Sequence, residues 1–181
     1  MAVGIIIFYF SKTMAGSSRA GMQIIAHECT HAFFALLTFH KVTKISIAED
    51  DSGGNMCFKG KGNWLIVIGP YFFPLFCFLC MIGISTYTHF APSNLILNGI
   101  LGYFVGYHID TVVSQIHDKQ TDLPKVGYKF CLMFLPGANF WMIGSILAYN
   151  SRGWEGIGVY FKLINYLNSR NYEALINYLA G

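Results

Sequence analysis

No Asp, Glu, Lys or Arg occurs in the long segment between Lys61 and Asp110. A helix crosses the hydrocarbon core of a bilayer with about 20 apolar residues, so this segment is too long for a single crossing. The polar, proline-containing sequence HFAPSN at residues 89–94 divides it into two predicted spans, 64–88 and 94–116. This pattern predicts a polytopic membrane protein and argues against an ordinary soluble domain.

Three more apolar stretches extend this prediction. The uncharged residues between Lys129 and Arg152 predict a span over 128–149, and the apolar residues 20–40 predict a fourth. The sequence MAVGIIIFYFSK at residues 1–12 predicts a short membrane segment that is retained. Hydrophobic residues make up 54% of the chain and charged residues 12%, against about 25% charged residues in typical soluble proteins. The composition therefore favours a surface that faces lipid.

The connection that follows the predicted span over 20–40 has the pattern of a β-hairpin. Ile45 and Ile47 alternate with polar residues, and so do Met56 and Phe58 on the other side of the turn-forming sequence DDSGGN. We therefore expect a two-stranded hairpin beside the membrane.

The residues after Arg152 differ from the rest of the chain, because their apolar side chains recur at helical spacing between charged and polar ones. This pattern predicts an amphipathic helical tail. We therefore expect an all-α polytopic membrane protein with about four transmembrane helices. Its membrane-embedded core covers residues 1–150, and the tail covers residues 151–181.

Lysine residues predict the orientation, because short cytoplasmic loops of membrane proteins are enriched in Lys and Arg. The two loops on the hairpin side, residues 41–63 and 117–129, contain Lys41, Lys44, Lys59, Lys61, Lys119, Lys125 and Lys129. We therefore expect the hairpin side to face the cytoplasm. The net charge of +3 is too small to indicate a nucleic-acid partner.

The sequence His27-Glu28-Cys29-Thr30-His31 is an H-E-x-x-H motif. On a helix, residues four apart differ by about 40° in direction, so His27 and His31 share one face and can bind one zinc ion. Glu28 can hold or deprotonate a water molecule beside that ion. The motif lies in an apolar segment, where ionisable side chains are costly and are usually functional. The alternative is a buried, hydrogen-bonded cluster that holds no metal.

A catalytic zinc ion usually has three protein ligands and one water molecule, so a third ligand is needed. The spacing of soluble zinc proteases does not supply it, because position 37 is Leu, His40 faces away on the helix and Glu49 lies in the hairpin. The remaining candidates are the later acidic and histidine residues: His108, Asp110, His117, Asp118 and Asp122.

The chain resembles the site-2 protease family of intramembrane zinc metalloproteases, and above all its compact bacterial members. Four features carry the resemblance: the H-E-x-x-H motif in a membrane helix, a membrane-side hairpin, a Gly-Pro-containing span and a later Asp. The resemblance covers residues 20–150. It implies that the third ligand lies in the segment HIDTVVSQIHDKQTDLPKVGYKF, although the L-D-G sequence of the family is absent there. We expect Asp122 to be this ligand, with Asp110 as the alternative. His108 and His117 remain alternatives as ligands, as hydrogen-bond partners of ligands or as oxyanion donors.

The resemblance implies a zinc-dependent endopeptidase that hydrolyses membrane proteins within or next to the bilayer. One catalytic Zn²⁺ ion, held by His27, His31 and Asp122, would act with Glu28 as the general base. The expected location is a bacterial inner membrane, and the expected partners are the lipid bilayer, a membrane-protein substrate and a regulatory protein. The alternatives are a non-proteolytic membrane protein of the same fold and a zinc transporter.

Overall fold

The computed structural model describes residues 1–14, 18–47, 53–92, 94–116 and 120–180. The chain forms two compact units, Met1–Met142 and Ile143–Gly181. The elements, in chain order, are α1 (Ala2–Met14), α2 (Ser18–Leu37), β1 (Val42–Ile47), β2 (Gly54–Phe58), α3 (Trp64–Ile68), the 3-10 helix η1 (Gly69–Tyr71), α4 (Leu75–Thr88), α5 (Leu95–Gln115), α6 (Asp122–Val126) and α7 (Tyr128–Ala180).

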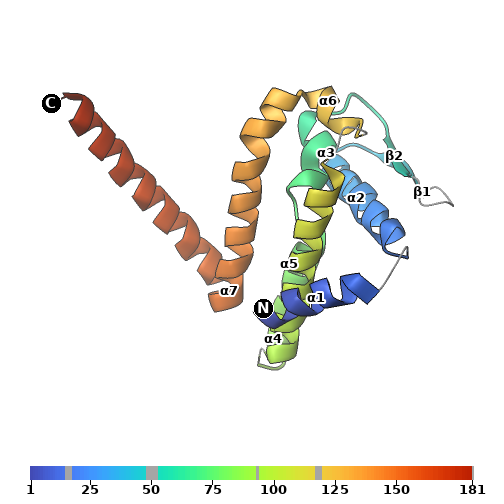
Figure 1. Cartoon of the computed structure of the whole chain (residues 1–181), viewed down its shortest axis with the longest axis horizontal. Helices are drawn as coiled ribbons and strands as arrows, with labels where there is room; N and C mark the ends of the chain where they lie inside the picture. The colour runs from blue at the N-terminus through green and yellow to red at the C-terminus, as the bar shows by residue number, and fades with distance from the viewer. Residues whose placement is uncertain (15–17, 48–52, 93, 117–119, 181) are drawn as a thin grey trace. The chain divides into compact units, whose positions relative to one another are not determined.

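The predicted hairpin is confirmed. Strands β1 and β2 pair in an antiparallel arrangement in which Ile45 lies opposite Met56 and Ile47 lies opposite Gly54. The hairpin packs against α2, which carries the H-E-x-x-H motif (Figure 1). The hairpin is therefore a neighbour of the motif in space as well as in sequence.

Two of the described helices are long and apolar enough to cross a membrane, namely α5 and the part of α7 over Tyr128–Leu179. A third crossing is formed if the Trp64–Tyr71 segment and α4, which meet at an angle of 79°, count as one broken span. Helix α2 is not one of these helices, since its polar motif residues make it less apolar than α5. The mostly helical fold is thus confirmed, and the expectation of four transmembrane helices stays a prediction.

The bend between η1 and α4 occurs where the sequence places prolines. Pro70 lies inside η1, and Pro74 immediately precedes α4. At the other end of the segment, the Asn63 side chain accepts a hydrogen bond from the backbone N–H of Ile66 and so caps α3. These residues turn one apolar stretch into two helices, of which the first lies beside the motif-bearing α2.

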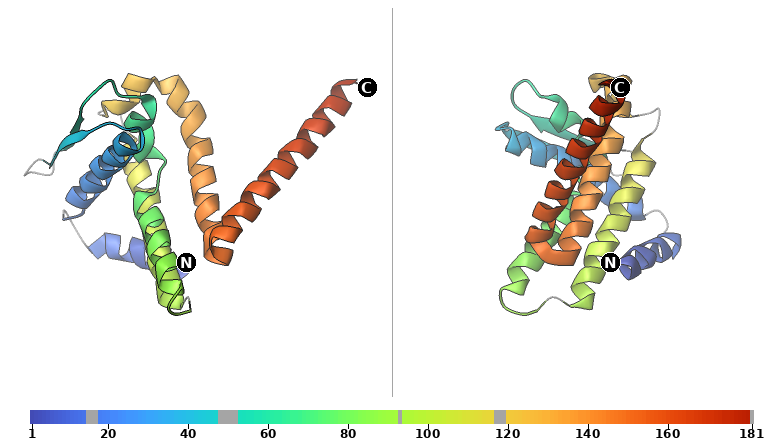
Figure 2. Two further views of the ribbon diagram at one scale, coloured as in Figure 1. Left: turned by 180° about the vertical axis from the view of Figure 1, so that it is seen from behind. Right: turned by 90° about the vertical axis from the view of Figure 1, so that its left-hand side faces the viewer.

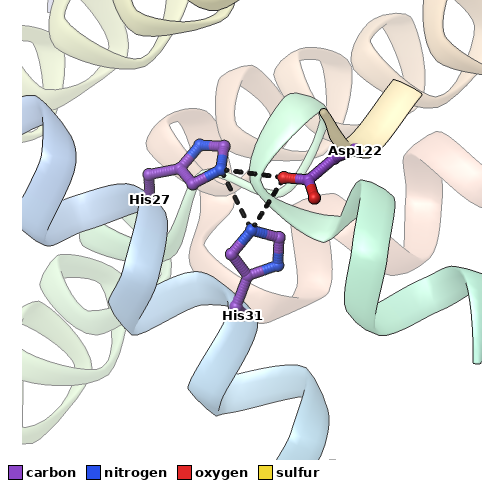
Figure 3. Close-up of side chains that lie close together, drawn as sticks. All are labelled: His27, His31 and Asp122. Carbon is purple, nitrogen blue, oxygen red and sulfur yellow. Dashed lines mark hydrogen bonds and ion pairs between the residues drawn. The ribbon is translucent and has the colours of Figure 1, made fainter. Parts of the chain in front are cut away.

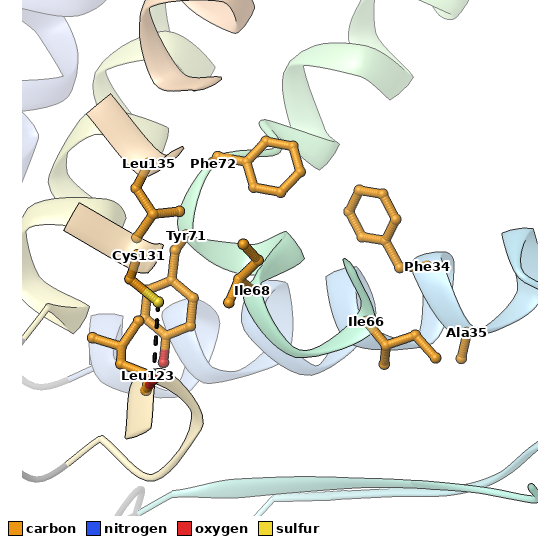
Figure 4. Packing of buried hydrophobic residues seen from close by; sticks show 9 residues of the cluster. All are labelled: Phe34, Ala35, Ile66, Ile68, Tyr71, Phe72, Leu123, Cys131 and Leu135. Carbon is orange, nitrogen blue, oxygen red and sulfur yellow. Dashed lines mark hydrogen bonds between the residues drawn. The ribbon is translucent and has the colours of Figure 1, made fainter. Parts of the chain in front are cut away.

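A core of buried side chains joins α2, α3, η1, α6 and the beginning of α7 (Figure 4). Its members are Phe34, Ala35, Ile66, Ile68, Tyr71, Phe72, Leu123, Cys131 and Leu135. In a bilayer, such side chains stabilise the fold mainly through van der Waals packing. Leu123 anchors the short helix α6 in this core, and this fixes the position of its neighbour Asp122.

Helix α1 packs closely against α5 because glycine residues of α5 lie at the contact. A Cβ atom at Gly102 would meet the backbone carbonyl oxygen of Met1, and one at Gly106 would lie 2.8 Å from the Phe8 ring. Phe8 is fully buried there, with its ring centroid 5.2 Å from that of Tyr103. The predicted N-terminal membrane segment is thus an apolar helix that docks on a longer one.

Helices α4 and α5 run side by side (Figure 2). Phe76 of α4 connects them, since its ring centroid lies 5.7 Å from that of Phe104 and 5.6 Å from that of Tyr107. In the second unit, α7 leaves helical geometry at Arg152 and at Gly153, where φ is +60°. The residues that follow are helical, as predicted for the tail, up to Ala180.

Candidate metal centre

Three potential ligand atoms, from helices α2 and α6, converge on one point (Figure 3). The Nε2 atoms of His27 and His31 are 3.0 Å apart, and the Oδ2 atom of Asp122 lies 3.4 Å from the first and 3.2 Å from the second. Tetrahedral zinc binds nitrogen and oxygen ligands at about 2.0–2.2 Å, which separates the ligand atoms by about 3.3–3.6 Å. Two imidazoles and a carboxylate at these separations fit a zinc ion.

Each histidine is held by a hydrogen bond through its other ring nitrogen. The Nδ1–H group of His27 donates to the side-chain oxygen Oε1 of Gln115 at 2.6 Å. The Nδ1–H group of His31 donates to the backbone carbonyl of Ile66, also at 2.6 Å. Both acceptors lack a proton, so both rings carry their proton on Nδ1 and present the Nε2 lone pair. This is the arrangement that orients histidine ligands in metal sites.

Asp122 is the first residue of α6 and presents its two carboxylate oxygens to different partners. Its Oδ2 atom faces the histidines, while Oδ1 accepts a hydrogen bond from the Lys125 Nζ at 2.9 Å. Burial raises the pKa of the carboxyl group, but the favourable interactions of the ionised form with His27, His31 and Lys125 outweigh it, so the pKa of Asp122 lies well below its usual range. The side chain is therefore ionised and offers one oxygen to a metal.

Glu28 is buried and lies beside the three candidate ligand residues in a cavity of about 540 Å³. The cavity walls come from α2, β2, α3, the end of α5, and α6. A carboxylate at this place can exchange a proton with a water molecule in the cavity.

Strand β2 forms one wall of this cavity with Gly54, Asn55 and Met56. A Cβ atom at Gly54 would lie 2.6 Å from the Cγ atom of Glu28, so the absence of a side chain lets the strand approach the carboxylate. Of the two strands, β2 lines the cavity, whereas the described residues of β1 do not.

The other candidate ligands lie elsewhere. The carboxylate of Asp110 pairs with Lys12 of α1 and accepts a hydrogen bond from the Gln23 side chain at 3.1 Å. His108 donates from Nε2 to the Asn139 side chain at 3.3 Å, which links α5 to α7. Within the described part of the chain, only His27, His31 and Asp122 form a group with metal-binding spacing. His117, together with Glu49 and Asp118, falls outside the described residues.

Several residues of the site were not identified from the sequence. Gln115 holds His27, and the Tyr71 hydroxyl donates to Oε1 of Gln120 at 3.0 Å. The Tyr71 ring stands perpendicular to the His27 ring, with the centroids 5.3 Å apart. The sequence feature that could have identified them is the pair of amides Gln115 and Gln120 near the end of an apolar span, where polar side chains are costly unless they are hydrogen-bonded.

A comparison with protein families finds a match to a family model. The sequence model of the Peptidase M50B-like family matches residues 1–108, which include His27, Glu28 and His31 but end before Asp122. No curated protein and no solved structure matches the chain.

Proposed function

Since the chain belongs to the Peptidase M50B-like family, we propose that it is an intramembrane zinc metalloprotease that cleaves membrane proteins within or next to the bilayer. The family and the apolar helices make it a site-2-protease-like integral membrane protein. The observation that carries the proposal is the position of Glu28, which shares one cavity with the ligand group of His27, His31 and Asp122.

Zinc bound by His27, His31 and Asp122 would supply Lewis acidity, which lowers the pKa of water and polarises a peptide carbonyl. The protein residues provide the remaining chemistry. Glu28 accepts a proton from the attacking water and delivers it to the leaving amine as the C–N bond breaks. Gln115 and the Ile66 carbonyl hold the imidazole rings, so the ligands need no reorganisation during the reaction.

A peptide bond inside a helix is shielded by its own helical turn, so the substrate must reach Glu28 in extended form. Strand β2 supports this requirement, because it lies beside Glu28 and lines the cavity. An extended segment can add to such a strand through backbone hydrogen bonds that do not depend on side-chain identity. The cavity, at about 540 Å³, is large enough for several residues.

The proposal also covers the membrane in which the protein lies and the proteins with which it interacts. The loop lysines support a cytoplasmic hairpin side. A bacterial inner membrane as the location and a regulatory protein as a partner are further parts of this proposal. A zinc transporter would need successive ligand groups along a path, whereas the described residues contain a single group that lies next to a potential base.

The experiment compares wild-type protein with Glu28→Gln, both reconstituted in vesicles with a panel of single-span membrane proteins. The variant retains the ligand residues, so it should bind as much zinc as wild type while losing cleavage by at least about 1,000-fold, because the base is gone. Measurement of zinc content and of cleavage products tests both statements. Cleavage by Glu28→Gln at a rate close to that of wild type would refute the proposed function.

A further inference from the structure

Hydrolysis of a peptide bond creates negative charge on the carbonyl oxygen. Water adds to the carbonyl carbon, the π electrons move to the oxygen, and Glu28 takes the proton of the water. Cleavage of the C–N bond then returns the electron pair to the carbonyl, and the proton goes to the leaving amine. A fixed hydrogen-bond donor near that oxygen is usually among the largest contributions to the rate.

Most polar side chains around the cavity already use their donor groups within the protein. The bonds are those of Gln23 Nε2 to Asp110, Gln115 Nε2 to the Gln23 carbonyl, Lys125 Nζ to Asp122, Ser114 Oγ to the Thr111 carbonyl and Asn55 Nδ2 to Cys57 Sγ. The Ser114 hydroxyl would have to break its bond before it could donate to a substrate, and the remaining N–H groups of the other four side chains are oriented by the partner that each already has.

Gln120 differs from these residues. It lines the cavity two positions before Asp122, and its Oε1 atom accepts a hydrogen bond from the Tyr71 hydroxyl at 3.0 Å. Within the described part of the chain, its Nε2 atom has no hydrogen-bond acceptor. Since the tyrosine occupies the oxygen, the amide presents its NH₂ group as the remaining donor.

Tyr71 is well suited to fix this amide. Tyr71 belongs to η1, and its side chain is fully buried in the core that η1 shares with α2 and α6. Its backbone carbonyl accepts a hydrogen bond from Asn139 at 2.9 Å, and its ring packs edge-on against His27. The hydroxyl group is therefore held at a constant place relative to a proposed metal ligand.

We propose that the side-chain NH₂ group of Gln120, oriented by Tyr71, stabilises the oxyanion that forms on the scissile carbonyl. This inference rests on the proposed protease function and adds a second catalytic residue to it. Tyr71 is a positioning residue, because it acts through Gln120 and does not touch the substrate.

The first test measures zinc content and the steady-state hydrolysis of casein by the full chain in detergent. Gln120→Met and Gln120→Glu should retain zinc and KM while kcat falls about 100-fold, the usual effect of losing one oxyanion donor. Thr121→Val, which removes the exposed neighbouring hydroxyl on the same wall, should change kcat by less than about threefold. A larger loss in Thr121→Val than in Gln120→Met overturns the assignment.

Tyr71→Phe separates positioning from packing, because it keeps the ring against His27 and removes only the hydroxyl. Its kcat should fall about tenfold with KM unchanged, and it should have no further effect in the Gln120→Met background. Independent, multiplicative effects of the two substitutions would overturn the role of Tyr71.

The second test does not depend on activity. The chain has three glutamines, Gln23, Gln115 and Gln120, so selective ¹⁵N-glutamine labelling gives few side-chain signals, and the Gln120 signal is the one missing in Gln120→Met or in Gln120→Glu. A phosphinic peptide, which carries a tetrahedral anion, should shift the Gln120 amide signal of zinc-loaded wild type. Binding without that shift overturns the inference.

The two proposals fail in different ways. If wild type cleaves casein and Glu28→Gln does not, while Gln120→Met keeps its kcat, only the role of Gln120 is wrong. If zinc-loaded wild type neither cleaves casein nor binds the phosphinic peptide, the proposed protease function is wrong and the role of Gln120 is wrong with it.

Discussion

The Nδ1 atom of His31 lies 2.6 Å from the backbone carbonyl oxygen of Ile66. This contact joins the motif-bearing helix α2 to α3, the first part of the broken span. With the ring held in this way, the Nε2 atom of His31 lies 3.0 Å from the Nε2 atom of His27 and 3.2 Å from the Oδ2 atom of Asp122. Because the acceptor is a backbone group, the orientation of His31 depends on the path of α3 and not on the identity of a side chain. The other histidine depends on a side chain and can therefore be tested.

Gln115→Ala should weaken zinc binding by about 10–100-fold, because it removes the acceptor that holds His27 and fixes its tautomer. Competition with a chelator of known affinity measures the change. The matched control is Ser114→Ala, since within the described residues the Ser114 hydroxyl bonds to a carbonyl of its own helix and not to a histidine. Equal zinc affinity in Gln115→Ala and Ser114→Ala would contradict the role of Gln115.

Asp122→Asn and Asp110→Asn should have opposite phenotypes. Asp122→Asn removes the anionic ligand and should lose most of the zinc, while Asp110→Asn should keep zinc at the wild-type level. Asp110→Asn should instead lower the thermal midpoint, because it breaks the pairing of a buried carboxylate with the partly exposed Lys12. The cost should lie between about 0–1 kcal/mol, as for an exposed ion pair, and about 3–5 kcal/mol, as for a buried one. Metal analysis and thermal unfolding of the same samples measure the zinc content and the stability of both variants. If Asp110→Asn loses zinc and Asp122→Asn keeps it, Asp110 is the ligand.

Gly54→Ala should reduce cleavage without loss of zinc. The added methyl group would lie 2.6 Å from Cγ of Glu28 and 2.7 Å from Cγ2 of Ile24, so either the carboxylate or strand β2 must move. A misplacement of about 1 Å in an active site can cost about 100-fold in rate. Gly53→Ala is the matched control, because nothing lies within 4 Å of its added Cβ atom. Similar cleavage rates for the two variants would show that the close approach of β2 does not matter.

Gly102→Ala should lower the stability of the fold by about 1–3 kcal/mol, because its Cβ atom would overlap the Met1 carbonyl and push α1 away from α5. Gly99→Ala meets no neighbouring atom, so it should be neutral or stabilise the helix by up to about 1 kcal/mol. Thermal unfolding in detergent measures the difference between the variants. An equal midpoint would mean that α1 does not depend on this contact.

The local parts of the fold and the site could be predicted from the sequence. The hairpin follows from the alternation of apolar residues around DDSGGN, and the apposition of His27 and His31 follows from helical spacing. The segment that contains Asp122 was identified through a resemblance, and the structure places that residue beside the histidines. Its role as a ligand is still a prediction.

The parts that could not be predicted depend on contacts between distant segments. Asp110 was a candidate ligand because nothing in the sequence shows that Lys12 of α1 reaches it, 98 positions away. The same holds for Gln115, which is 88 positions from His27, and for Gln120, which is 49 positions from Tyr71. Prolines indicated the break in the second span, but the 79° angle depends on how α3 packs against α2 and α6.

Pro70, the residue inside η1 near the bend, has a consequence for the chemistry of the site. In an unbroken α-helix the carbonyl of Ile66 would accept a hydrogen bond from the backbone N–H four residues later, and proline has no N–H. The missing donor leaves this acceptor available, and His31 takes the place of the missing N–H. An interruption in one helix thus sets the proton position on a side chain of another. The same imino acid that bends the span also selects the tautomer of a proposed metal ligand.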